Sequence, residues 1–117
     1  MKKIITILLI IASLSSCYND KEELLYPPIQ DECDNVNSSF SYDIYPIILN
    51  KCSISGCHNS SDIAANVILE TYEQVSGYSG IIYQVCITTQ SMPIGDRLTQ
   101  SEIKSLKCWL LSGSPNN

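Results

Sequence analysis

Histidine is almost absent from this chain of 117 residues, which contains only His58, and Met92 is the one methionine besides the initiator. Basic residues are also scarce, because seven Lys and Arg stand against twelve Asp and Glu, for a formal net charge of -5 at pH 7. Nucleic acids are bound through basic patches, so this balance argues against a nucleic-acid partner. A single imidazole also confines any histidine chemistry to the surroundings of His58.

The chain also lacks an apolar run long enough to span a bilayer. Its longest one, residues 4–12, follows Lys2 and Lys3 and is typical of a signal peptide. The run ends in LSSC at residues 14–17, which resembles the lipobox of bacterial lipoproteins. We therefore expect residues 1–16 to be a lipoprotein signal peptide and Cys17 to carry the lipid. The alternatives are an ordinary secretory signal or an uncleaved apolar anchor.

Acidic residues are concentrated after the expected cleavage site, and removal of the two leader lysines changes the formal charge from -5 to -7. With Pro27 and Pro28 in the middle, residues 17–39 are predicted to be a disordered, lipidated acidic tether. Residues 40–117 then form one domain without an internal repeat. So small a core usually needs a metal, disulfides or a bound cofactor.

His58 directly follows a cysteine in the motif CSISGCH at residues 52–58. Two neighbouring thiols can add to the two vinyl groups of haem, and the next residue's imidazole then reaches the iron, most often with the spacing C-x-x-C-H. Here the spacing matches the longer C-x4-C-H variant, and Gly56 can adopt the backbone angles that the bulge requires. The motif predicts haem attachment at Cys52 and Cys57, with His58 as an iron ligand.

Two other interpretations of this motif stay open. Cysteines close together in an exported protein are often disulfide partners. A Cys/Cys/His cluster can also bind zinc, with Cys86 or Cys108 as the fourth ligand, although the second tight pair of most zinc modules is missing. We favour haem over zinc, because the histidine directly follows the second cysteine, as in haem attachment motifs.

Met92 lies in the polar stretch TTQSMPIGD at residues 88–96, which has loop character. A lone methionine is usually flexible core filler, but core filler rarely lies in such a loop. Pro93 favours an extended backbone at Met92, which holds the thioether on a defined loop. Together with His58, Met92 is therefore the candidate for the sixth position on the iron.

The apolar pattern of the domain predicts helices. A first helix from Ser41 or Asp43 would carry an apolar face and tolerate Pro46 in its first turn. The branched run at residues 81–87 favours a strand by propensity, but we assign it as a helix because a haem domain needs a helical wall before Met92. The apolar face of the first helix would consist of Ile44, Ile47 and Ile48, and that of the last helix of Ile103, Leu106 and Leu110. Capping boxes at Thr71/Gln74 and Thr99/Glu102 predict helix starts, and Gly77, Gly80 and Gly113 predict helix ends.

Residues 40–117 resemble a single-haem cytochrome c domain of bacterial lipoproteins. The likeness rests on YPII at 45–48, CH at 57–58, MP at 92–93, LT at 98–99 and WL at 109–110. It implies an all-α, cytochrome c-like domain around one covalent haem c, in which the first and last helices cross. Cys52 and Cys57 would form the thioethers, and His58 and Met92 would be the axial ligands. Trp109 is expected on or near the haem.

With both axial positions filled by protein, the expected activity is one-electron transfer by a carrier and not enzymatic turnover. Redox proteins would be the partners of this exported lipoprotein, which would be anchored to a membrane of a Gram-negative-type bacterium and face the periplasm or the cell surface. An alternative is a haem-free, disulfide-stapled surface lipoprotein that acts as an interaction module. A haem sensor or small peroxidase with Met92 displaced is a further one, although no second histidine exists as a distal acid or base.

Three cysteines remain outside these sites, namely Cys33, Cys86 and Cys108. They allow one disulfide, and the sequence does not determine which pair forms it. We favour Cys86 with Cys108, because both lie in the folded domain. Cys33 would then be free or bonded to a partner.

Overall fold

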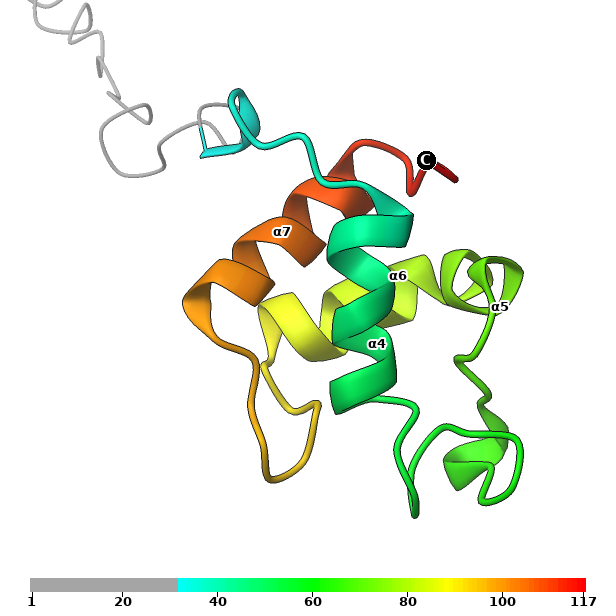
Figure 1. The fold of residues 1–117 in the computed structure, drawn as a ribbon. Helices are drawn as coiled ribbons and strands as arrows, with labels where there is room; N and C mark the ends of the chain where they lie inside the picture. The colour runs from blue at the N-terminus through cyan, green and yellow to red at the C-terminus, as the bar shows by residue number, and fades with distance from the viewer. Residues whose placement is uncertain (1–31) are drawn as a thin grey trace, which may run out of the picture.

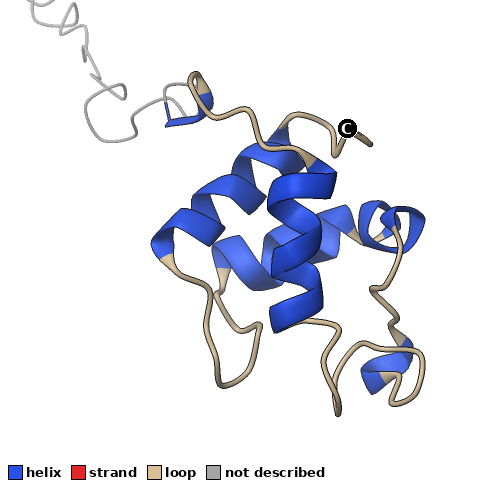
Figure 2. Cartoon of the chain, in the orientation of Figure 1, coloured by secondary structure: helices blue, strands red, loops and turns tan. Residues whose placement is uncertain are grey.

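The computed structural model describes residues 32–117, which fold into helices and loops without a strand in that range (Figures 1 and 2). This confirms the prediction of a small all-α domain. The predicted signal peptide, the expected lipidation site at Cys17 and most of the predicted tether lie outside the described residues. Within residues 32–117, every helix is too short or too polar to cross a membrane.

The first helix consists of a π-helical turn, η1 (Phe40–Ile44), which continues into α4 (Tyr45–Lys51). It begins slightly before the predicted start, because the Ser39 hydroxyl accepts a hydrogen bond from the Tyr42 N–H and caps the end. Pro46 lies in the first turn of α4, where the bonding pattern changes from π to α and its missing N–H is tolerated. The predicted apolar face is confirmed, since its three isoleucines are buried.

The middle of the chain contains a short 3-10 turn and a run of helical segments: η2 (Ala64–Asn66), α5 (Tyr72–Gly77), α6 (Ser79–Ile82) and η3 (Tyr83–Thr88). The capping box of Thr71 and Gln74 starts α5, as predicted. Gly77 ends α5, whereas Gly80 lies inside α6 and does not break it. The ambiguous run at 81–87 is helical, which confirms that assignment. Burial of Ile82 and Cys86 against the other helices outweighs the strand propensity of the branched residues.

The last helix is α7 (Gln100–Leu111), and its capping box of Thr99 and Glu102 is also confirmed. Figure 1 shows α7 lying against the first helix. Trp109 is fully buried, and its ring centroid is 5.6 Å from that of Phe40. The Trp109 indole N–H donates to the Pro115 carbonyl at 2.9 Å, so the tail after α7 folds back over this core.

A disulfide joins Cys33 to Cys108, with a Cα–Cα distance of 5.4 Å. The predicted pairing of Cys86 with Cys108 is therefore wrong. Packing of α7 against η1 brings the chain that precedes η1 next to α7, and an ion pair between Glu32 and Lys107 lies beside the disulfide. Residues 33–39, which were predicted to be tether, are thus attached to the domain.

Replacement of both Cys33 and Cys108 by serine should lower the free energy of unfolding by about 2–5 kcal/mol, because the crosslink restricts the unfolded chain over a long loop. Urea denaturation of the mature chain measures this loss. Added reductant should shift the wild-type midpoint in the same direction and leave that of the double variant in place. A wild-type urea midpoint that does not change when reductant is added would contradict a stabilising disulfide.

Candidate cofactor-binding site

The main cavity of the domain has a volume of about 310 Å³ and lies among α4, the loop after it, the α6–η3 helix and the loop that contains Met92. Cys52, Cys57, His58 and Met92 all line it. The structure thus brings the four residues predicted to hold a haem to one place. The remaining lining residues are Ile48, Lys51, Gly56, Ala64, Ala65, Val67, Leu69, Tyr78, Ile81, Ile82, Val85, Cys86, Pro93, Ile94 and Leu106.

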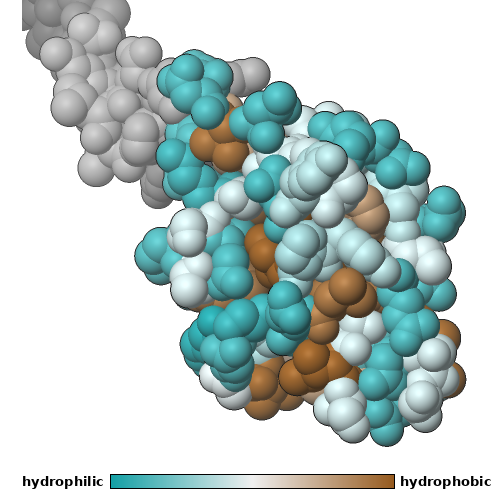
Figure 3. All heavy atoms as spheres, in the orientation of Figure 1, coloured by the Kyte–Doolittle hydropathy of each residue, from teal (hydrophilic) through white to brown (hydrophobic). Residues whose placement is uncertain are grey.

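Most of this lining is apolar, as in pockets that bury organic ligands. Ile48, Ile82 and Leu106 line the cavity and also belong to the buried core, so the core forms one of its walls. Hydrophobic side chains also gather on the lower half of the molecule in Figure 3, where the end of α4 and the neighbouring loops reach the surface. Ile81 and Ile94, which line the cavity, are mostly exposed.

The loop of the CSISGCH motif is closed by main-chain hydrogen bonds. The His58 N–H donates to the Cys52 carbonyl at 3.0 Å, which returns the chain to the first cysteine despite the four intervening residues. Gly56 adopts a φ of +80°, and its N–H donates to the Asp62 carboxylate at 2.7 Å. That hydrogen bond lowers the pKa of Asp62. The glycine therefore makes the bulge that the longer spacing requires.

The imidazole of His58 is held by two carbonyl groups from the turn that follows. Its Nδ1 lies 3.1 Å from the Ala64 oxygen and 3.3 Å from the Val67 oxygen. Because a carbonyl only accepts a hydrogen bond, Nδ1 carries a proton, and Nε2 takes no part in these two contacts. A histidine that binds a metal is usually oriented through its other nitrogen in this way.

The turn that supplies these carbonyls has a strained backbone. Ile63, Ala65 and Asn66 have φ values of +43°, +54° and +59°. Such angles are rare for a branched side chain such as that of Ile63. Hydrogen bonds from the Ile63 N–H to the Asn59 carbonyl and from the Ala64 N–H to the Cys57 carbonyl hold the turn in place. Strain of this kind is concentrated at functional sites, and here it directs the Ala64 carbonyl at the imidazole.

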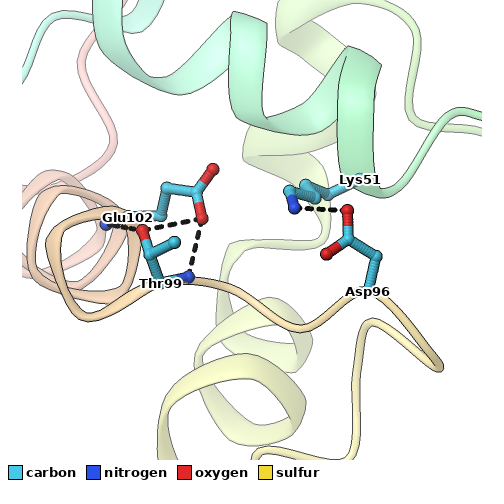
Figure 4. A network of polar contacts seen from close by, with 4 residues as sticks. All are labelled: Lys51, Asp96, Thr99 and Glu102. Carbon is cyan, nitrogen blue, oxygen red and sulfur yellow. Dashed lines mark hydrogen bonds and ion pairs between the residues drawn. The ribbon is translucent and has the colours of Figure 1, made fainter.

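The loop that carries Met92 is anchored at both ends. The Met92 N–H donates to the Val85 carbonyl at 3.1 Å on the η3 side. On the other side, Asp96 pairs with Lys51 of α4, and the Thr99 capping box begins α7 (Figure 4). The hydrogen bond to Asp96 raises the pKa of Lys51. The thioether of Met92 therefore lies on a defined loop at the cavity wall.

Burial controls the ionisation of the thiols in the cavity. It raises the pKa of Cys52 to about 12, with smaller contributions from the neighbouring Cys86 and Cys57 thiols. Burial also raises the pKa of Cys86 to about 11. Both groups are thus neutral thiols at pH 7, which slows oxidation and disulfide exchange, because the thiolate is the reactive form.

Several features of the site differ from the expectation for haem. Cys86 lines the cavity as a third thiol, whereas the sequence placed it near the motif only in the zinc alternative. Trp109, which was expected on or near the haem, is not among the lining residues and packs against Phe40. Cys108 is consumed by the disulfide, and within residues 32–117 no three His, Cys, Asp or Glu side chains are grouped to hold a metal ion.

Comparisons with protein-family models, with curated proteins and with solved structures found no match to this chain. The chemistry of the cavity is accordingly inferred from its own residues.

Replacement of Ile63 by asparagine should lower the free energy of unfolding by about 1 kcal/mol less than the same replacement at Ile54, because asparagine tolerates the left-handed conformation that costs other residues about 1–2 kcal/mol. Ile63 is 39% exposed, so the replacement also removes some apolar burial, and the control corrects for that loss. The matched control is Ile54→Asn, since Ile54 is 42% exposed and is not among the positive-φ residues. Urea unfolding of both variants measures the difference, and equal changes in the two would show that Ile63 is not strained.

Proposed function

We propose that this chain is an exported lipoprotein whose helical domain is a c-type cytochrome that binds one haem covalently and carries single electrons. The observation that carries this proposal is the convergence of two thiols, an imidazole and a thioether on one apolar cavity. Cys52, Cys57 and His58 are close in sequence, but Met92 reaches the same cavity from the loop before α7.

The residues of the cavity fit the requirements of haem. Its mostly apolar lining suits the porphyrin plate, and the hydrogen-bonded loop keeps Cys52 and Cys57 at the same wall as the imidazole. His58 has its Nδ1 engaged by carbonyls, which leaves Nε2 for the metal. When bound, haem supplies an iron that exchanges one electron between its ferric and ferrous states.

Each side chain would then have a distinct role. Cys52 and Cys57 would hold the cofactor through thioether bonds, and His58 and Met92 would bind its iron. Iron bound by both side chains would leave no position for a substrate, so we infer a carrier and not an enzyme. Methionine ligation raises the reduction potential relative to other axial ligands, and the apolar walls limit the access of water. Redox proteins are the expected partners, and nucleic acid is not.

Export is supported by two separate parts of the chain. The apolar leader and the lipobox-like LSSC suggest that Cys17 is lipidated, with the domain facing the periplasm or the cell surface. The disulfide between Cys33 and Cys108 agrees with an oxidising compartment, because such bonds are rare in the bacterial cytoplasm. Residues between Cys17 and Cys33 would link the lipid to the domain.

The central prediction concerns covalent haem. Residues 17–117 produced in a periplasm with c-type maturation machinery should gain the mass of one haem and stain for haem on a denaturing gel. The Cys52→Ser/Cys57→Ser double variant should lose the covalent haem. Cys86→Ser is the matched control, because this thiol lines the same cavity but lies outside the motif, and it should keep the haem. Folded wild-type protein without haem, beside a matured control cytochrome, would overturn the proposal and favour the disulfide-stapled interaction module.

The role of Met92 is tested separately. Met92→Ala should retain the covalent haem, since both thioethers and His58 remain, but should lose the absorption band of thioether-ligated low-spin ferric iron. Its reduction potential should fall, because the methionine ligand favours ferrous iron. Optical spectra and potentiometric titration measure these changes. A variant with the wild-type spectrum would exclude Met92 as the axial ligand.

A further inference from the structure

A shallow groove separate from the main cavity lies between α6–η3 and the last turn of α7. Its volume is about 290 Å³, and it is lined by Ser79, Gly80, Tyr83, Leu110 and Leu111. None of these residues lines the main cavity. Leu111 is 47% exposed, so the described part of the chain leaves apolar surface uncovered in this groove.

The lining of the groove has the chemistry of a site for proline-rich segments. Tyr83 offers an aromatic ring, and Leu110 and Leu111 offer aliphatic surface beside it. Gly80 has no side chain, and even an added Cβ would meet nothing within 4 Å, so the surface there is open. Proline-rich peptides in an extended conformation dock on aromatic-lined grooves of this kind.

The chain itself contains a segment with matching chemistry. Residues 24–29 read LLYPPI and stand between acidic residues on both sides in the sequence. They form the only apolar run between Cys17 and Cys33. A solvated spacer is usually polar, so an apolar run within it indicates a segment that packs against a surface. Pro27 and Pro28 restrict their own φ angles and favour extended conformations at the residue before each, so little conformational entropy is lost on docking.

The disulfide places this segment within reach of the groove. Cys33 is bonded to Cys108, and Leu111 follows Cys108 by three residues, about 4.5 Å along the axis of α7. Ile29 precedes Cys33 by four residues, so extended chain between them spans about 13 Å. This short connection gives the segment a high effective concentration at the groove.

We propose that residues 24–29 dock into the groove formed by Tyr83, Leu110 and Leu111, with the two prolines against the tyrosine ring. If Cys17 carries the lipid, as proposed above, docking shortens the spacer between that lipid and the domain to residues 18–23, which span about 20 Å when extended. The same tether undocked would span about 50 Å up to Cys33. The groove therefore sets how far from the membrane the domain can meet a partner.

A photo-crosslinking residue at position 111 tests the contact in the full mature chain. Replacement of Leu111 by benzoylphenylalanine keeps an apolar side chain at the groove, and irradiation should yield an intrachain crosslink to residues 24–29, identified by mass spectrometry. Leu49 is the matched control position, because it is 41% exposed on α4 and lies outside the groove. A crosslink from position 111 only to other parts of the chain, or between two copies, would overturn the proposal.

The crosslinking residue could itself disturb the groove, so a second comparison changes the docking segment instead. Leu24→Ser/Leu25→Ser should reduce the crosslink yield by about tenfold or more, because it removes the two leucine side chains that docking would bury. Glu22→Ser/Glu23→Ser, the adjacent matched control, should leave the yield unchanged. Equal yields in the two variants would contradict docking. Neither the groove nor residues 24–29 contain a proposed haem residue, so the result is independent of haem attachment.

Discussion

The contact between Trp109 and Phe40 is the interaction on which the rest of the domain depends. It joins the last helix to the first, and Phe40 also packs edge-on against Tyr72 of α5 with centroids 5.1 Å apart. A fully buried tryptophan removes about 150–250 Å² from water, which stabilises the fold by about 4–6 kcal/mol. Because α7 packs on η1 in this way, the segment that precedes η1 lies beside α7. Cys33 of that segment is therefore close enough to Cys108 of α7 to form the disulfide.

In this arrangement, the residues that stabilise the fold lie apart from the residues proposed to bind the cofactor. The aromatic core lies where η1 meets the C-terminal half of α7, while Cys52, Cys57, His58 and Met92 belong to the segments that follow α4 and η3. Ile48, Ile82 and Leu106 connect the two regions, because they belong to the core and also line the cavity. A flat apolar cofactor in the cavity would extend the core, which is how a domain of this size gains stability.

The orientation of the His58 imidazole depends on a strained turn of the backbone at residues 63–66. The positive φ angles around Ala64 cost free energy that the turn recovers only through hydrogen bonds to its surroundings. The two carbonyls at this turn orient the His58 imidazole through its Nδ1. The Lys51–Asp96 pair and the Val85 carbonyl restrain the facing loop with its methionine. The proposed ligands are thus held by main-chain geometry before any cofactor binds.

The sequence by itself determined the local features: both capping boxes, the apolar face of the first helix, the Gly56 bulge and the types of donor atoms available for haem. These depend on residues three or four positions apart, so their physics is contained in a short window. Only the tertiary structure decided that Cys33 bonds to Cys108, that Cys86 joins the main cavity, and that Trp109 packs on Phe40 away from it. Those outcomes depend on how helices distant in sequence pack, and local pattern carries no information about that packing.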